Sequence, residues 1–250
     1  LNIFLFSFIL LLIFIFTVLS TIGYETENFN NFITNKIYST NKNVSLNLKK
    51  VKFKLDVKNI SLFLETKDPN INYYGLRIPI KDIKVYLNII SLIKSKTKVN
   101  KVHITSDEID IEKLKKILIK TKPSNLNSLI VNKVTNGFLV TNIEFYLDEN
   151  MKIDNFIARG EVRNMQAHMY KDLTLKDTSF SFFTDNSDTI VKNIKAKTKG
   201  IIIKEGSLNI NKNKSETKIK SDFKTNLSLK KIDLMKYLSG REELDQIDKN

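Results

Sequence analysis

Apolar and polar residues alternate with a period of two along much of this sequence. Between Lys218 and Lys230 the odd-numbered positions carry Ile, Ser, Phe, Thr and Leu, and the even-numbered positions carry Lys, Asp, Asn and Ser. The segment from Lys50 to Lys58 alternates in the same way. Successive side chains of a strand point to opposite faces of a sheet, so this period predicts strands with one apolar face and one polar face.

Further alternating runs predict a succession of antiparallel strands separated by turns rich in Asp, Asn and Gly. The runs 51–57 and 60–64 flank Asn59 and predict either a hairpin or one long bent strand. A helix is predicted over 107–119, because apolar residues share one face there and lysines follow acidic residues along it. The fold class is therefore mainly β with short helices. The other predicted strands cover 83–87, 99–104, 137–147, 152–158, 173–183, 189–199, 201–210 and 218–230.

The beginning of the chain is almost continuously apolar, and no charged residue occurs between Leu1 and Tyr24. A helix needs roughly 20 apolar residues to cross the hydrocarbon core of a bilayer. The run therefore predicts a transmembrane anchor over residues 1–23. The apolar side chains assigned to this anchor include Phe4, Phe8, Leu11, Phe14 and Val18.

A cleaved signal peptide is the alternative to an anchor, because Val18 and Ser20 fit the small-residue pattern of a cleavage site. Both alternatives take the rest of the chain out of the cytoplasm. The flank after the run favours the same orientation, since Glu25 and Glu27 come first and the nearest lysine is Lys36. The chain begins without Met, and we expect it to be a fragment of a longer protein.

Apolar residues recur at helical spacing between positions 25 and 39, at Phe29, Phe32, Ile33 and Ile37. This spacing predicts a short amphipathic helix after the anchor. The helix either lies at the membrane surface or packs against the first strands.

Composition limits the partners of the chain. Lysine and arginine outnumber aspartate and glutamate by 41 to 27, which gives a formal net charge of +14. These positive charges are spread along the chain, often near an acidic residue, and form no arginine cluster, so nucleic acid is not a predicted partner. The sequence has no cysteine, which excludes disulfides and cysteine ligands.

The sequence carries no phosphate loop, nucleophile elbow or paired-histidine metal motif. Its two histidines, His103 and His168, are far apart and are interpreted as ordinary strand residues. The acidic residues between 107 and 112 suit the beginning of a helix. We therefore expect no catalytic residue, no metal, no cofactor and no enzymatic activity.

The apolar faces of so many strands need a cover, which a closed sandwich, a barrel, or a molecule seated in an open groove would supply. Periodicity alone does not distinguish these arrangements. We divide the chain into the anchor at 1–23, a first β segment with its helix at 24–122, and a second β segment at 123–250.

Two segments of the first third resemble the N-terminal region of AsmA-like envelope proteins, the group that includes YhdP and TamB. The segment from Val44 to Glu65, VSLNLKKVKFKLDVKNISLFLE, forms a strand pair after a single span. The segment from Ile78 to Ile104, IPIKDIKVYLNIISLIKSKTKVNKVHI, runs from a strand into a short apolar turn, a polar step and another strand. The resemblance covers about residues 1 to 120 and rests on patterns of residue type.

The resemblance implies a single-pass protein of the bacterial inner membrane with its body in the periplasm and its sheet curved into an elongated groove. The apolar interior of that groove would carry the acyl chains of phospholipids towards the outer membrane, with an outer-membrane or periplasmic protein as a further partner. A closed-core scaffold or an outer-membrane protein assembly factor is the alternative. The residues that would line the start of the groove are Phe53, Leu55, Val57, Ile60, Leu62, Leu64, Ile83, Val85 and Leu87.

Overall fold

The computed structural model describes residues 2–28, 30–58, 61–87, 98–150, 152–170, 173–198, 200–213 and 216–227. Its helices are α1 (Asn2–Thr21), α2 (Asn30–Thr40), α4 (Ile111–Ile119) and α5 (Asn125–Lys133). The first nine strands are β1 (Tyr24–Thr26), β2 (Val44–Asn47), β3 (Val51–Asp56), β4 (Ser61–Lys67), β5 (Asn70–Tyr73), β6 (Leu76–Ile78), β7 (Ile80–Leu87), β8 (Val99–Ser106) and β9 (Ile109–Asp110). The longer strands that follow are β10 (Val134–Leu147), β11 (Ile153–Tyr170), β12 (Leu173–Thr184), β13 (Asp188–Thr198), β14 (Ile201–Lys212) and β15 (Thr217–Leu227).

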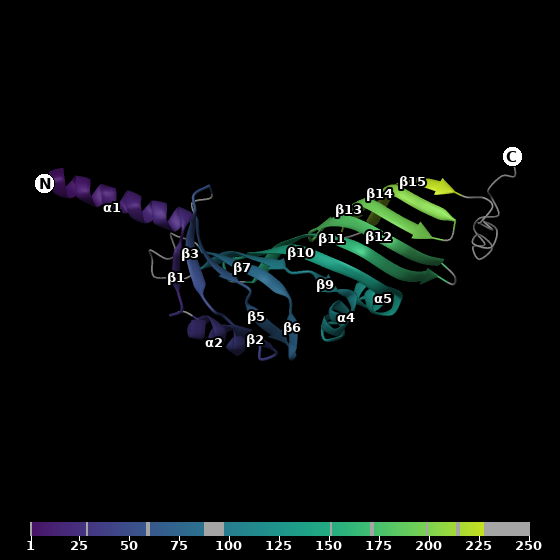
Figure 1. Ribbon diagram of the computed structural model, residues 1–250, viewed down its shortest axis with the longest axis horizontal. Helices are drawn as coiled ribbons and strands as arrows, with labels where there is room; N and C mark the ends of the chain where they lie inside the picture. Colours follow the sequence, from purple (N-terminus) through teal and green to yellow (C-terminus); the bar gives the residue numbers. More distant parts are fainter. Residues whose placement is uncertain are drawn as a thin grey trace.

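One 12-stranded sheet runs through the molecule in the order β1-β3-β4-β7-β8-β10-β11-β12-β13-β14-β15, with β9 paired to β10. All pairings within it are antiparallel. The order has two ends, β1 and β15, so the sheet is not closed. The molecule is elongated, with α1 at one end and β15 near the other (Figure 1). The predicted fold class, an N-terminal apolar helix followed by a large antiparallel sheet, is confirmed.

The first strand of the sheet follows α1 after a tight glycine turn. The backbone N–H of Gly23 donates to the carbonyl of Val18 at 2.8 Å, and Tyr24 then pairs with Phe53 of β3. Gly23 has a φ of +78°, and a Cβ there would lie 2.7 Å from both the carbonyl oxygen of Phe53 and the Lys54 side chain. Glycine alone suits this position, and the sheet therefore begins directly at the end of the apolar helix.

A small cover packs on the first strands. The strands β2, β5 and β6 form a separate three-stranded sheet. Ile33 and Ile37 of α2 pack against the buried Leu46 and Val51, so the amphipathic helix predicted after the anchor packs against the first strands. Val51 is only 2% exposed. This end of the large sheet therefore has a closed apolar core.

A helical hairpin packs on β10 and β11. Ile111 of α4 forms a buried cluster with Val134 and Ala167, and Ile130 of α5 packs against that cluster. The two helices contact each other as well as these strands. The second cover therefore lies further along the strand order than the first, on the same side of the sheet in Figure 1.

The helix predicted over 107–119 begins later than expected. Asp110 is its N-cap, and its side chain accepts a hydrogen bond from the backbone N–H of Lys113 at 2.9 Å. Ile109 and Asp110 form β9, where Ile109 pairs with Leu139. The prediction of a helical start at 107 was wrong because the acidic residues before Asp110 precede the cap.

Two other differences concern β11 and α5. Strand β11 continues to Tyr170, well past the predicted end at 158, and α5 was not predicted. The predicted hairpin of 51–57 and 60–64 is confirmed as β3 and β4, whose register pairs Leu55 with Leu62. The apolar turn after Leu87 and the end of the last predicted strand lie outside the described residues.

Candidate functional site

Strand register places one row of apolar side chains across six neighbouring strands. Directly opposed residues of an antiparallel pair project from the same face of the sheet. Rows two residues away along each strand lie on that face too, so the register defines a continuous apolar face. The row consists of Phe53, Leu64, Val85, Val102, Phe145 and Phe156.

The apolar face contains seven of the nine residues predicted to line it. They are Phe53, Leu55, Leu62, Leu64, Ile83, Val85 and Leu87. Val57 instead follows the end of β3 and is 53% exposed. Ile60 lies outside the described residues. Register thus brings together side chains that come from three strands and span more than thirty positions of the sequence.

The apolar face continues over the second half of the sheet, where no lining residue was predicted. The period-two alternation of these strands was the sequence signal that could have identified their lining residues. Two glycines also lie on this part of the face, each beneath an aromatic ring of the neighbouring strand: Gly160 beneath Phe182 and Gly206 beneath Phe223. Further apolar residues of this half are Val162, Phe180, Val191, Leu208, Ile210 and Ile219.

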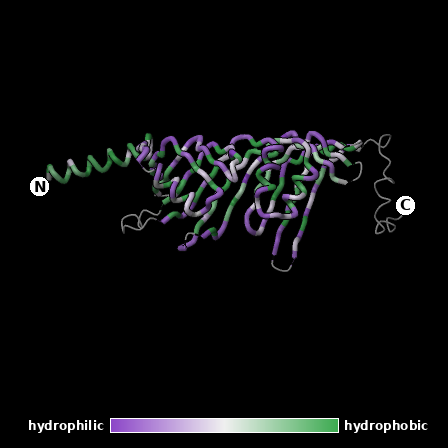
Figure 2. Tube along the Cα trace, turned by 90° about the horizontal axis from the view of Figure 1, so that it is seen from below, coloured by the Kyte–Doolittle hydropathy of each residue, from purple (hydrophilic) through white to green (hydrophobic). Residues whose placement is uncertain are grey.

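Burial is uneven along the apolar face. Val51 is buried beneath the small sheet and α2, whereas Val85, Val102 and Phe145 are only half-buried. At the far end Ile219 is 63% exposed. Figure 2 shows the same alternation of apolar and polar residues along the strands. In the described residues, the middle and far parts of this face therefore lack the dense core that a closed sandwich provides.

The opposite face carries charges that neutralise one another across the strands. Lys52, Glu65, Lys84, His103 and Glu144 form one row. Glu65 is buried, with Lys54 Nζ at 3.3 Å and Lys84 Nζ at 3.5 Å from its carboxylate oxygens. Burial alone would raise the pKa of Glu65, but these two lysines outweigh it and hold that pKa below its usual value.

Glu144 has a similar environment further along the row. Burial tends to raise its pKa, but a hydrogen bond from the Tyr146 hydroxyl at 2.7 Å and the charges of Lys101 and Arg159 lower it. The Lys101 and Arg159 nitrogens lie 3.5 Å and 3.2 Å from the Glu144 carboxylate. The Glu65 and Glu144 carboxylates are therefore ionised at neutral pH and paired with cations.

Aromatic side chains on the polar face lie beneath lysine ammonium groups. The rings of Phe63 and Tyr86 stack with their centroids 5.2 Å apart. Lys101 Nζ lies 4.4 Å from the centroid of Tyr86, and Lys84 Nζ lies 6.0 Å from that of Phe63. The aromatics of this face are thus covered by charged groups, unlike those of the apolar face.

The two histidines lie apart, as their sequence positions suggested. His103 is in β8, where burial lowers its pKa, and His168 is near the end of β11 with its Nδ1 2.9 Å from the Thr174 hydroxyl. The described residues contain no group of three or more His, Asp or Glu side chains that could hold a metal ion.

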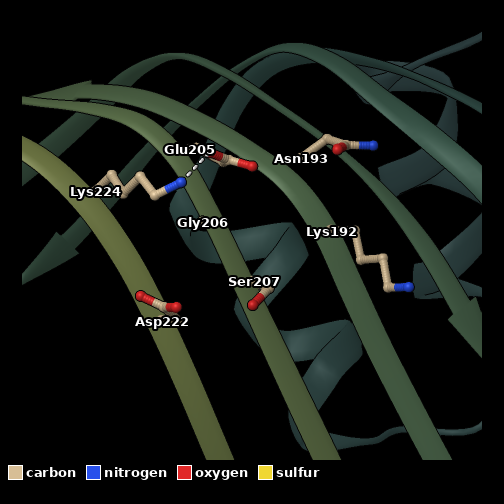
Figure 3. A pocket seen from close by; sticks show the side chains of 7 residues that line it. All are labelled: Lys192, Asn193, Glu205, Gly206, Ser207, Asp222 and Lys224. Atoms are coloured by element: carbon tan, nitrogen blue, oxygen red, sulfur yellow. Dashed lines mark hydrogen bonds and ion pairs between the residues drawn. The ribbon is translucent and has the colours of Figure 1, made fainter.

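A hollow on the polar face near β15 is the alternative candidate site (Figure 3). It encloses about 190 Å³. Lys224 and Glu205 form an ion pair of 2.9 Å at its edge, and Lys192, Ser207 and Asp222 line the rest. Its charged side chains are exposed to solvent, so it offers neither an apolar wall nor a desolvated charge for a ligand.

The residues assigned to the anchor all lie in α1. The segment Ile3–Thr21 has a mean hydropathy of 2.9, is not buried in the molecule, and is long and apolar enough to cross a membrane. The hydroxyl of Thr17 donates to the carbonyl of Ile13 at 2.8 Å, so this polar group is satisfied within the helix. The assigned anchor residues Phe4, Phe8, Leu11, Phe14 and Val18 are all in this segment.

Comparisons with known proteins give no relative for this chain: no family model, no curated protein and no solved structure matches it significantly. The function therefore has to be argued from the apolar face, the polar face and α1.

Proposed function

We propose that this protein is anchored in a bilayer by α1 and carries phospholipids by holding their acyl chains against its apolar face. The observation that carries the proposal is the continuity of that face across an open sheet whose middle is only half-buried. A partly exposed apolar surface that continues across neighbouring strands is typical of a binding site.

Hydrophobic burial supplies the driving force. Covering apolar surface stabilises the covered state by roughly 25 cal/mol per Å². An acyl chain lying along Val85, Val102 and Phe145 would remove both its own methylenes and these side chains from water. Because neighbouring strands continue the row at about 4.8 Å intervals, a chain could move along it without losing its apolar contact at any one strand.

The two faces of the sheet support the proposal in different ways. The polar face carries cross-strand ion pairs such as those of Glu65 and Glu144, and its charged side chains suit contact with water. The apolar face, in contrast, offers few polar groups, so headgroups would remain in water at the strand ends. The proposal requires no catalytic residue, since transfer breaks no covalent bond.

Location is part of the same proposal. We place α1 in the inner membrane of a bacterium and the sheet in the periplasm, with phospholipid passing towards the outer membrane. The flank after α1 carries no lysine or arginine before Lys36, which supports a body on the non-cytoplasmic side.

The alternative is a scaffold or an outer-membrane protein assembly factor that carries no lipid. One observation favours it: near α2 the apolar face is already filled by Leu46, Leu48 and Val51. A scaffold would require the middle of the face to be filled as well.

Native mass spectrometry with lipid extraction tests the proposal on the full chain purified from membranes in mild detergent. The test variant is Leu55→Asp with Leu62→Asp, which puts two carboxylates on the apolar face. The matched control is Asn155→Asp with Ser181→Asp, which adds the same two charges to the polar face. We expect the native chain and the control to retain phospholipid and the test variant, folded by circular dichroism, to lose it. Equal lipid content in both variants, or none in the native chain, would refute lipid carriage.

A further inference from the structure

The helical hairpin α4–α5 presents an outward surface that the proposed lipid carriage does not use. Residues 111–133 contain six lysines and a single acidic residue, Glu112. That glutamate is paired with Lys115 at 3.3 Å. The remaining lysines of the hairpin, all of them exposed, are Lys113, Lys116, Lys120, Lys122 and Lys133.

Three aliphatic side chains are exposed among these lysines. Ile119 and Leu126 are each 65% exposed, and Leu129 is 44% exposed. Helical spacing puts Leu126, Leu129 and Lys133 on one stripe of α5, while Ile119 shares a stripe of α4 with Lys116. The apolar side chains that hold the hairpin to the sheet are different ones, so the exposed set is not needed for packing.

The hairpin is also well ordered by local interactions. Asp110 caps α4, and the Ser124 hydroxyl caps α5 by accepting from the backbone N–H of Asn127 at 3.1 Å. The Asn127 side chain donates to the Thr121 hydroxyl at 3.0 Å across the turn. Exposed aliphatic groups and lysines are thus held on two capped helices that pack on the sheet.

The residue types favour a lipid surface over a protein partner. Protein interfaces are enriched in Trp, Tyr and Arg and depleted in Lys. The hairpin instead combines Leu and Ile with lysine and contains no arginine or aromatic residue. That combination is typical of helices that insert aliphatic side chains among anionic headgroups.

The lipid surface that the hairpin would meet is separate from the bilayer that would hold α1. Helix α1 leaves the sheet at β1 and points away along the long axis, whereas α4 and α5 pack beside β10 and β11 (Figure 1). Five strand-to-strand steps separate β1 from β10, which is roughly 24 Å at about 4.8 Å a step. Helix α1 also contacts β3, at this same end of the sheet.

From the exposed lysines and aliphatic side chains of α4–α5 we propose that this hairpin docks on the anionic surface of a second bilayer. The inference relies on the proposed function only for the assignment of α1 to a membrane. Docking would bring a second membrane alongside the apolar face, and it does not require that face to hold lipid.

A tethering assay tests the proposal. The full chain is reconstituted through α1 in phosphatidylcholine vesicles, and labelled vesicles of phosphatidylcholine with phosphatidylglycerol are added. We expect capture of the anionic vesicles, weakened by salt, and no capture of pure phosphatidylcholine vesicles. Lys116→Gln, Lys120→Gln and Lys133→Gln together should weaken capture about a hundredfold.

Two control variants separate the role of the hairpin lysines from a general effect of charge and from lipid carriage. Lys192→Gln, Lys195→Gln and Lys220→Gln remove the same charge from exposed positions of the sheet and should leave capture unchanged. The variant with Leu55→Asp and Leu62→Asp should capture normally even if it carries no lipid, which separates this proposal from lipid carriage. Equal losses in the two lysine variants, or equal capture of neutral vesicles, would overturn the assignment of the hairpin, and an acidic protein would then be the better partner.

Discussion

Two valines on the same apolar face should respond very differently to an aspartate substitution. Val51 is 2% exposed beneath the small sheet, whereas Val102 is half-buried between Val85 and Phe145 in the uncovered middle. Val51→Asp loses about 2 kcal/mol of hydrophobic burial and places a carboxylate in a closed core, which costs several kcal/mol more. The total of about 5 kcal/mol is comparable to the whole stability of a small domain.

Val102→Asp should cost far less. Its side chain loses only part of the burial free energy of a valine, about 1 kcal/mol, and its carboxylate remains hydrated if the face is open. The lower strand propensity of Asp adds up to about 1 kcal/mol. We therefore expect a loss of about 1 to 2 kcal/mol, measured as a shift of the urea unfolding midpoint followed by far-UV circular dichroism.

Equal destabilisation by the two valine substitutions would refute this reasoning. If Val102→Asp destabilises the protein as much as Val51→Asp does, the middle of the apolar face is closed and the argument for an open binding surface is wrong. Circular dichroism is the suitable probe because the chain has no Trp for a fluorescence signal.

Three further predictions concern single positions of the sheet and the hairpin. Gly160→Ala should cost about 1 to 3 kcal/mol, because the added Cβ would meet the carbonyl oxygen of Val140; denaturant unfolding measures this loss. The pKa of Glu65 is lower in the folded protein than its unfolded value near 4.5, so the ionised carboxylate stabilises the fold above that pH. This stabilisation is lost as the pH falls through the folded pKa. Glu65→Gln should therefore flatten this part of a plot of unfolding free energy against pH. Asp110→Ala should cost about 1 kcal/mol, since the N–H of Lys113 loses its cap, and hydrogen exchange should rise in the first turn of α4.

The sequence predicted the strands well where alternation was regular. The runs at β3 and β15 alternate almost without interruption, and the structure has strands there. The part of β11 beyond Ala158 escaped prediction because Gly160 follows and the alternation then breaks at a bulge: Asn164 has a φ of +52°, and the pairing with β12 shifts between Val162 and Met165. A bulge puts two successive residues on one side, which removes the period on which the prediction relied.

Helices were harder to predict than strands. The helix α4 has a clear apolar stripe, but the position of its cap at Asp110 depended on Ile109 pairing with Leu139, a contact between distant parts of the sequence. The helix α5 has only a weak stripe, since Leu126 and Leu129 point to solvent while Ile130 packs inward. No element was predicted for its residues for that reason.

The candidate site was predicted in part. Alternation placed Leu55, Leu62 and Val85 on one face correctly, because register follows from the turns that join neighbouring strands. The lining of the far half was missed because the family resemblance ended near residue 120. The covers over Val51 and Val134 arise from tertiary packing, which periodicity does not encode.

The most direct test of lipid carriage uses two neighbouring residues of β10. Phe145 lies on the apolar face, and Tyr146, whose hydroxyl bonds Glu144, lies on the polar face. A photoreactive phenylalanine analogue at either position changes little in shape, and the products formed in membranes after irradiation are identified by mass. We predict a phospholipid adduct at Phe145 and none at Tyr146. Equal adducts at both positions, or none at either, would contradict a phospholipid on the apolar face.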